Sequence, residues 1–405
     1  MNEKTAGELS SLNPSDAQYA TRFVEIVLAA GRERGASDLH LQPTPEGLEM
    51  RWRVDGVLIG LGTFPSGVTA NVIARLKVLA DLLTYRNDVP QEGRIRTDDA
   101  DVEVRVSTFP TLYGERAVVR LFSSKLRYRD LSELQLPEEI LSRLRGLLIE
   151  TSGAILVTGP AGSGKTTTLY ACLHELVRAS GGARSMVTLE DPIEVAVPGV
   201  AQSQINVSAG FDLAAGLRSV LRQDPEVIMI GEIRDAATAE VALQASLTGQ
   251  LVLSSFHAGS AVEAIGRLLD MGIEPYMLRS GVLAVLFQRL VRKLCHCARP
   301  SRGQDEHLGL PVREARVAVG CPACAGTGYL GRTVLAEMLS MDEGTLARAI
   351  VARTDVATLE QLALGSGMID RWQRAAHAVE AGLTSPAEVR RVLGFSKNQS
   401  DQTGY

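Results

Sequence analysis

Residues 159–166 read GPAGSGKT, and this stretch constrains the fold of the chain more than any other. It matches the motif G-x-x-x-x-G-K-[ST], which is meaningful when an apolar strand precedes it and a helix follows it. Both conditions hold, because residues 154–157 are apolar and residues 167–176 read as a helix. A chance glycine-rich turn is disfavoured, since strand, loop and helix agree. We therefore predict a P-loop nucleotide-binding domain.

The residues of this loop have distinct predicted roles. The glycines let backbone N–H groups wrap phosphates, and the helix N-terminus adds a favourable dipole. Lys165 would reach the β- and γ-phosphates of ATP, and the Thr166 hydroxyl would hold Mg²⁺. The predicted nucleotide-binding residues are Gly159, Pro160, Ala161, Gly162, Ser163, Gly164, Lys165, Thr166 and Thr167.

Apolar strands alternate with helical stretches around the motif. The predicted strands are residues 154–157, 186–189, 227–230 and 251–253. This alternation predicts an α/β domain with a parallel sheet that helices cover on both faces. In such a sheet the chemistry gathers at the carboxyl ends of the strands.

Three polar side chains follow these predicted strands. Glu190 follows the second strand, Glu232 follows the third in a Gly-Glu pair typical of a Walker B end, and His257 follows the fourth. Phosphoryl transfer to water needs a carboxylate that organises the metal and a group that orients the water. The alternative interpretation is that the carboxylates are helix caps or surface salt bridges and that His257 is a hydrogen-bonded structural residue.

The first third of the chain reads as a small α+β module. An amphipathic helix at residues 20–34 precedes short alternating strands, a second helix and two more strands that end near residue 124. The predicted boundaries are a loose tail at 1–19, the α+β domain at 20–124, a linker at 125–137, the ATPase domain at 138–294, a cysteine-rich insert at 295–331, a C-terminal helical part at 332–394 and a disordered tail at 395–405.

Four of the five cysteines form two close pairs. Cys295 and Cys297 are separated by His296, and Cys321 and Cys324 have the spacing common in zinc sites. Four thiolates could hold one tetrahedral Zn²⁺, and such a site is structural because no coordination position stays open. His296 or His307 could replace one thiolate, and free buried cysteines are the alternative.

Charge and hydropathy exclude several classes of protein. The net charge is −5, so a nucleic-acid substrate is not expected. No apolar run is long enough to span a bilayer, and the polar N-terminus lacks the apolar centre of a signal peptide. We expect a cytoplasmic protein whose membrane contact is peripheral. Hydrophobic residues make up 45% of the chain, enough for sizeable cores.

Eight motifs between about residues 36 and 394 resemble one known family, the type II secretion and type IV pilus assembly ATPases (the secretion-traffic ATPases). In order they are SDLHLQP, RWRVDGVL, PQEGR, VRVSTFPTLYGERAVVRLF, GAILVTGPAGSGKTTTLYA, TLEDPIE, LRQDPEVIMIGEIRD and LSSFHA. The resemblance implies a PAS-like N-terminal domain joined to a RecA-like ATPase domain, within a homohexamer. It also implies ATP hydrolysis that powers secretion or pilus assembly, with inner-membrane platform and docking proteins as partners.

The resemblance assigns further site residues. TLEDPIE resembles the Asp box and carries Glu190, while SSFHA resembles the His box and carries His257. Arg105 and Arg120 match arginines that approach the nucleotide from the N-terminal domain, and Arg116 is a weaker match. Without the family, Arg105 and Arg120 would read as the exposed face of two strands. A tetracysteine insert is typical of secretion and pilus assembly members rather than of retraction motors.

The sequence also departs from the family pattern. About twenty residues precede the first helix, so docking through a separate N-terminal domain must differ or be missing. The His box has less polar neighbours than usual. Because of these departures, a second interpretation stays open, in which the chain is a nucleotide-binding scaffold with weak hydrolysis. A third interpretation is a RecA-like nucleic-acid translocase.

Overall fold

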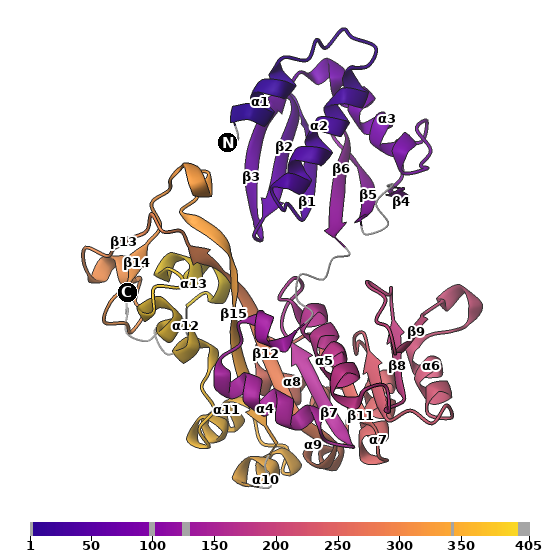
Figure 1. Ribbon diagram of the computed structural model, residues 1–405, viewed down its shortest axis with the longest axis vertical. Helices are drawn as coiled ribbons and strands as arrows, with labels where there is room; N and C mark the ends of the chain where they lie inside the picture. Colours follow the sequence, from indigo (N-terminus) through magenta and orange to yellow (C-terminus); the bar gives the residue numbers. More distant parts are fainter. Residues whose placement is uncertain (1–2, 97–101, 124–129, 342–343, 396–405) are drawn as a thin grey trace. The chain divides into compact units, whose positions relative to one another are not determined.

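The computed structural model describes residues 3–96, 102–123, 130–341 and 344–395. It contains two compact units (Figure 1). The first comprises Met1–Lys125 and Val319–Leu330, and the second comprises Leu126–Ala318 and Gly331–Tyr405.

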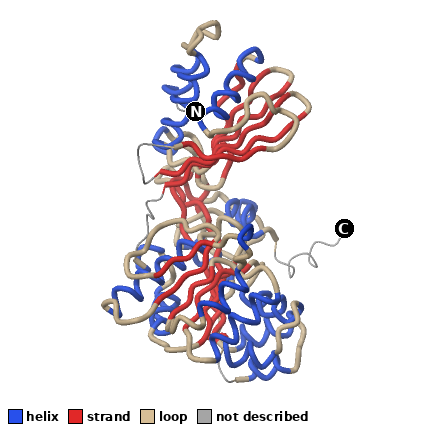
Figure 2. The backbone as a smooth tube through the Cα atoms, turned by 90° about the vertical axis from the view of Figure 1, so that its right-hand side faces the viewer, coloured by secondary structure: helices blue, strands red, loops and turns tan. Residues whose placement is uncertain are grey.

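The first unit is a six-stranded sheet with helices on one face (Figure 2), in the strand order β3-β2-β1-β6-β5-β4. Alternate residues of its strands, such as Leu39 and Leu41, are buried in one core with Phe23 and Val27 of α2. Its elements are α1 (Glu3–Ser10), α2 (Tyr19–Glu33), β1 (Asp38–Thr44), β2 (Gly47–Val54), β3 (Val57–Phe64), η1 (Ser66–Val68), α3 (Thr69–Leu79), β4 (Gln91–Ile95), β5 (Val102–Thr111) and β6 (Gly114–Ser123).

The N-terminal segment differs from the loose tail expected from the sequence. Glu3–Ser10 forms helix α1, and Leu9 is buried in the same core as Phe23. A single buried leucine in a polar stretch gives no readable periodicity, so tertiary packing rather than local pattern explains this helix.

The second unit is built on a seven-stranded sheet in the order β15-β12-β7-β11-β10-β8-β9. The pairs β12–β7, β7–β11, β11–β10, β10–β8 and β8–β9 are all parallel. Helices lie on both faces (Figure 2), as the strand–helix alternation predicts. The strands are β7 (Gly153–Thr158), β8 (Met186–Glu190), β9 (Ala201–Gln204), β10 (Val227–Ile230), β11 (Leu251–Phe256), β12 (Val282–Leu294) and β15 (Tyr329–Ser340), with the small pair β13 (Arg299–Pro300) and β14 (Arg316–Val317) beside them.

Alternation along the strands divides the apolar residues of the second unit between two cores. On β7, Ile155 and Val157 pack with α4 and α5, whereas Ala154 and Leu156 pack with the helices on the other face. A third, smaller core joins α12 and α13 to the end of β12. The helices are α4 (Glu138–Leu148), α5 (Lys165–Ser180), α6 (Leu213–Val220), α7 (Ala236–Leu247), α8 (Ala261–Asp270), α9 (Pro275–Gly281), α10 (Thr345–Val351), α11 (Val356–Gly365), α12 (Arg371–Glu380) and α13 (Pro386–Leu393).

One part of the secondary-structure prediction is wrong. Residues 332–340 were expected to be helical, but they continue strand β15. Both faces of this strand carry buried residues, such as Leu335 and Ala336. A doubly buried strand has no period-2 alternation, so its pattern resembles that of a buried helix. The helices α10 to α13 follow as expected.

The predicted linker and the predicted C-terminal tail fall partly outside the described residues. The parts concerned are the start of the predicted linker, at residues 125–129, and residues 396–405 of the predicted tail. The described part of the linker contains a short 3₁₀ helix, η2 (Leu131–Leu134), whose Leu131 is buried in the core beside α4 and α5. Among the described residues, no helix combines the length and apolarity needed to cross a bilayer.

Candidate active site

The phosphate loop joins the end of β7 to the start of α5. Three glycines of the loop have positive φ values, a backbone conformation that residues other than glycine rarely adopt. The values are 141° for Gly159, 73° for Gly162 and 91° for Gly164. A Cβ on Gly159 would lie 2.4 Å from the carbonyl oxygen of Gln288. The loop therefore has the strand–loop–helix context that gives the sequence motif its meaning.

Gln288 on β12 holds this loop, and the sequence did not reveal it. Its side chain is buried, its Nε2 donates to the carbonyl oxygen of Ser163 at 2.8 Å, and its Oε1 accepts from the Thr168 hydroxyl at 3.0 Å. One amide thus ties the loop to the first turns of α5. The only sequence signal was a single amide side chain within the apolar run of β12.

The ammonium group of Lys165 lies against the loop that carries it. Nζ donates to the carbonyl oxygens of Gly159 at 2.9 Å and Pro160 at 3.0 Å. Burial lowers the pKa of Lys165, and the negative charge of Glu232 partly offsets that effect. The cation is thus half-buried at the position where the motif predicts phosphate oxygens.

Glu232 and His257 contact each other beside the loop. Nε2 of His257 lies 2.8 Å from Oε1 of Glu232, and because a carboxylate accepts, Nε2 carries the hydrogen. Nδ1 of His257 lies 3.1 Å from the carbonyl oxygen of Gly159. The other oxygen of Glu232 accepts from Nε of Arg234 at 3.1 Å. The ends of β10 and β11 therefore meet the phosphate loop through this pair.

Glu190 at the end of β8 is buried within a hydrogen-bond network. Oε1 accepts from the Thr188 hydroxyl at 2.5 Å and from Nε2 of Gln202 at 3.0 Å, and Oε2 accepts from the Tyr170 hydroxyl. Burial and the Glu190 carboxylate raise the pKa of Tyr170, so this hydroxyl stays protonated and donates. Glu190 is neither a helix cap nor a surface salt bridge, the two alternatives that the sequence left open.

A cavity of about 240 Å³ collects these groups at the carboxyl ends of the strands. Its lining includes Lys165, Thr166, Glu190, Glu232 and His257. The structure therefore brings together five side chains that the sequence nominated from four separate motifs. A basic group, a hydroxyl, two carboxylates and an imidazole around one cavity can bind a phosphate with its metal ion and activate water.

A second, smaller cavity of about 120 Å³ lies on the other side of the α5 N-terminus. It is bordered by Gly164 and Thr167. Three leucines contribute apolar surface, and polar side chains such as Glu133 and Arg332 also line it; the leucines are Leu134, Leu136 and Leu290. This cavity is thus partly apolar where the first is polar.

The predicted arginines belong to the first unit, whereas the loop belongs to the second. Arg105 on β5 lies directly opposite Arg120 on β6, and Nε of Arg120 donates to Asp38 at 2.9 Å. Arg116 contacts Nδ1 of His40 at 3.2 Å. Arg105 and Arg120 are thus neighbours in one cross-strand row, and the weaker candidate Arg116 is engaged elsewhere in that sheet.

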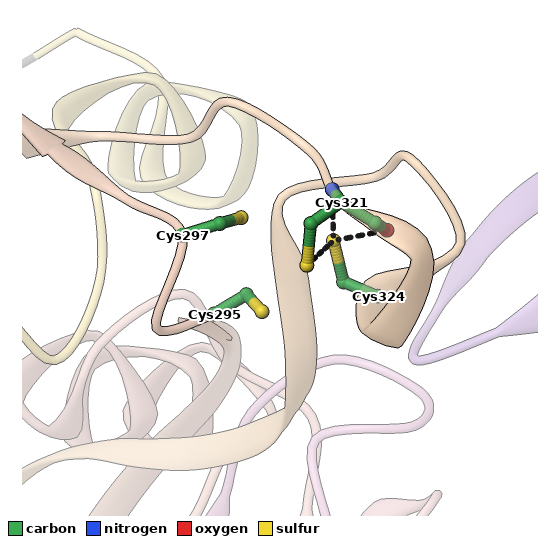
Figure 3. A group of neighbouring side chains, drawn as sticks. All are labelled: Cys295, Cys297, Cys321 and Cys324. Carbon is green, nitrogen blue, oxygen red and sulfur yellow. Dashed lines mark hydrogen bonds between the residues drawn. The ribbon is translucent and has the colours of Figure 1, made fainter.

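The four paired cysteines come together in one cluster (Figure 3). The sulfur atoms of Cys295, Cys297, Cys321 and Cys324 all lie within 4.8 Å of one another. The Cys321 and Cys324 sulfurs are 3.8 Å apart, which equals the separation of about 3.8 Å that tetrahedral Zn–S bonds of about 2.3 Å require.

The surroundings of the cluster also suit thiolates. Backbone N–H groups of Cys321 and Gly328 donate to the Cys324 sulfur at 3.1 and 3.2 Å, and such donors stabilise negative charge on sulfur. His307 points its Nε2 at the Ser301 hydroxyl, 3.0 Å away, and is not in the cluster. The donor set therefore fits a closed Cys₄ zinc site.

Comparison with known proteins decides the family. The family model described as type II/IV secretion system protein matches residues 13–391. This chain belongs to that family. It is 40% identical over 391 residues to the type II secretion system protein E of Klebsiella pneumoniae, covering 94% of this chain and 77% of the relative. It is 36% identical over 385 residues to the type IV pilus assembly ATPase PilB of Thermus thermophilus, covering 92% of this chain and 43% of PilB.

The fold of the chain is shared with a solved ATPase structure. The structure matches the ATPase DotB of Legionella pneumophila with a TM-score of 0.68 at 22% identity, covering 93% of this chain and 96% of DotB. This match confirms the expected α/β fold, and the family model with the sequence relatives confirms the expected family. Three residues of the site were not predicted from the sequence. Gln288 forms hydrogen bonds with the phosphate loop and α5, and Tyr170 and Gln202 form hydrogen bonds with Glu190.

Proposed function

We propose that this chain is an ATP-hydrolysing motor, acting as a homohexamer, that powers type II secretion through pseudopilus assembly or type IV pilus assembly. One observation carries the proposal: Lys165, Thr166, Glu190, Glu232 and His257 line a single cavity at the carboxyl ends of the parallel strands. The secretion and pilus assembly relatives support the choice of process.

Each cavity residue has a role that follows from its contacts. Lys165 would exchange its carbonyl partners for the β- and γ-phosphate oxygens, and Thr166 would hold Mg²⁺. Glu232 is the better candidate for orienting the attacking water, because its carboxylate borders the cavity and is held there by Arg234 and His257. Glu190 has three side-chain donors, which suits a fixed carboxylate that organises the water shell of the metal.

The smaller cavity suits the nucleoside. It begins at Gly164 and Thr167, so a base placed there would continue directly from phosphates in the loop. Its leucines offer the apolar surface on which an adenine ring can stack. The nucleotide would thus lie across the N-terminus of α5.

Arg105 and Arg120 would complete the site from the first unit of a subunit. A guanidinium is always charged and can neutralise the γ-phosphate as charge develops on it. Arg105 and Arg120 lie directly opposite each other on β5 and β6, and Asp38 pairs with Arg120, so their guanidinium groups belong to one charged row of the sheet. Their approach to the loop stays a prediction.

The remaining properties follow from the same reading. The cysteine cluster would hold structural Zn²⁺. The protein would act in the cytoplasm, peripherally associated with the inner membrane through platform and docking proteins of the apparatus. The acidic balance of the chain gives no reason to expect nucleic acid as a partner.

Steady-state ATP hydrolysis, measured against protein concentration, tests this function. The motor reading predicts turnover that rises as subunits assemble and that Lys165→Ala abolishes. Near wild-type hydrolysis by that variant would refute the active-site assignment. Nucleotide binding without turnover at any concentration would favour a scaffold, and strong stimulation by DNA would favour a translocase.

A further inference from the structure

A single carboxylate on β15 holds two helices of the second unit. Glu337 is 1% exposed, and its Oε1 accepts from the backbone N–H of Ala261 at 2.8 Å while its Oε2 accepts from that of Arg371 at 2.7 Å. Ala261 and Arg371 are the first residues of α8 and α12. The first N–H groups of a helix have no partner within the helix, so one side chain satisfies a donor of both.

The first of these helices is attached to the backbone of His257. The guanidinium group of Arg267 on α8 donates a hydrogen bond to the His257 carbonyl oxygen. The same group lies 5.5 Å from the centre of the Phe256 ring. The N–H of Gly259 donates to Glu263, also on α8, at 3.1 Å. The position of His257 therefore depends on where α8 begins.

The second helix belongs to the C-terminal helical part. The Arg371 guanidinium lies 3.6 Å from Glu337 and 3.6 Å from Glu360 on α11. Burial raises the pKa of Glu337, and the N–H groups and the Arg371 charge oppose that shift. Loss of either helix contact would thus leave a carboxylate oxygen buried without a donor, which is costly.

We propose that Glu337 is a positioning residue for ATP hydrolysis: it holds the start of α8 so that the His257 imidazole meets Glu232, and it couples α12 to that geometry. This inference rests on the proposed role of His257 in hydrolysis. Glu337 itself is not among the residues that line the cavity. Its effect must therefore travel through the 2.8 Å contact to Ala261 and the short segment back to His257.

The test compares Glu337→Gln with Glu360→Gln in the full chain. Glu360 faces the same arginine, but among the described residues it accepts no hydrogen bond from the start of α8, so it is a matched control. Because small displacements of a reacting group can cost up to about 100-fold, we expect Glu337→Gln to lower kcat about tenfold, with the KM for ATP and the affinity for ADP within about twofold. Glu360→Gln should leave all three unchanged. A normal kcat for Glu337→Gln would overturn the proposal.

A double mutant separates positioning from general loosening. If Glu337 acts through His257, Glu337→Gln should cause no further fall of kcat in a His257→Ala background. Multiplicative effects would overturn the proposal. If His257→Ala alone hydrolyses ATP normally while Lys165→Ala does not, the role of His257 fails and the proposed coupling fails with it, although the ATPase assignment stands.

Nuclear magnetic resonance gives a readout that does not depend on turnover. The chain has six histidines, so ring ¹³C labelling yields few signals, and the His257 signal is the one missing in His257→Ala. It should shift in Glu337→Gln and stay in place in Glu360→Gln. Should Glu337→Gln fail to fold, the exposed Arg267→Met tests the same link. An unshifted His257 signal and a normal kcat in that variant would overturn the proposal.

Discussion

Gln288 binds the phosphate loop by donating its side-chain amide to the carbonyl oxygen of Ser163 at 2.8 Å. The same amide accepts from Thr168 on α5, so β12 fixes both the loop and the helix that follows it. The loop therefore depends on a strand that carries none of the nucleotide motifs.

Replacing the Gln288 amide should destabilise the conformation in which the phosphate loop binds nucleotide. Gln288→Leu keeps most of the volume but leaves the Ser163 carbonyl and the Thr168 hydroxyl without partners, at about 1–3 kcal/mol for each buried group. We expect a lower free energy of unfolding in urea and about tenfold weaker ADP binding, since about 1.4 kcal/mol corresponds to tenfold. Gln244→Leu on the exposed face of α7 is the control, and equal ADP affinity in both variants would contradict the prediction.

Glu232→Gln should separate binding from turnover. The amide keeps the size of the side chain but cannot accept a proton from water, so hydrolysis should fall at least about 100-fold while ATP binding persists. Filter binding of labelled ATP and phosphate release measure the two effects. Glu240→Gln on α7 is the control, and an equal loss of binding and turnover would count against the role of Glu232.

The cysteine cluster should hold one zinc ion for each chain. Cys297→Ser removes one thiolate, so elemental analysis should show loss of the metal, and the melting temperature should fall because a structural site contributes to folding. Cys172→Ala is the control: this thiol is buried in α5, and burial raises its pKa to about 12. Wild-type protein without zinc after expression in zinc-supplemented medium would disprove the assignment.

Glu388 should make stability depend on pH. Burial alone would raise its pKa, but hydrogen bonds from Arg391 and Arg292 outweigh burial and lower the pKa below its usual value. A lowered pKa contributes stability above the unfolded value of about 4.3, and this is lost as the pH falls through the folded value.

Urea unfolding at different pH values measures this effect against Glu388→Gln. Wild type should be more stable by about 3 kcal/mol near neutral pH, because the variant removes the carboxylate charge that faces the nearly buried Arg292. The difference should shrink below about pH 4. A constant difference from neutral to acidic pH would show that Glu388 does not titrate as described.

The sequence allowed prediction of the residues that lie at strand ends, because the P-loop motif and the alternating pattern are local signals. Glu190, Glu232 and His257 were nominated in this way and border one cavity. Gln288 and Glu337 could not be found, since Thr168 and Ala261, with which they form hydrogen bonds, are more than 70 residues away in the chain. Their roles depend on which strands become neighbours in the sheet.

The same limit explains the remaining differences. Strand β15 is buried on both faces and so lacks the alternation that would mark it as a strand. The C-x-C spacing of Cys295 and Cys297 did not establish a metal site, because only the folded chain brings these sulfurs within 4.8 Å of Cys321 and Cys324.

Strand β12 is thirteen residues long, and it connects the phosphate loop, helix α13 and the cysteine cluster. Gln288 holds the phosphate loop, Arg292 pairs with Glu388 of α13, and Cys295 follows the end of the strand. Side chains alternate between the faces of a strand, so inserting or deleting one residue after Gln288 would turn Arg292 to the wrong face. Relatives should therefore differ in the residue types between Gln288 and Cys295 but keep the same number of residues in this segment.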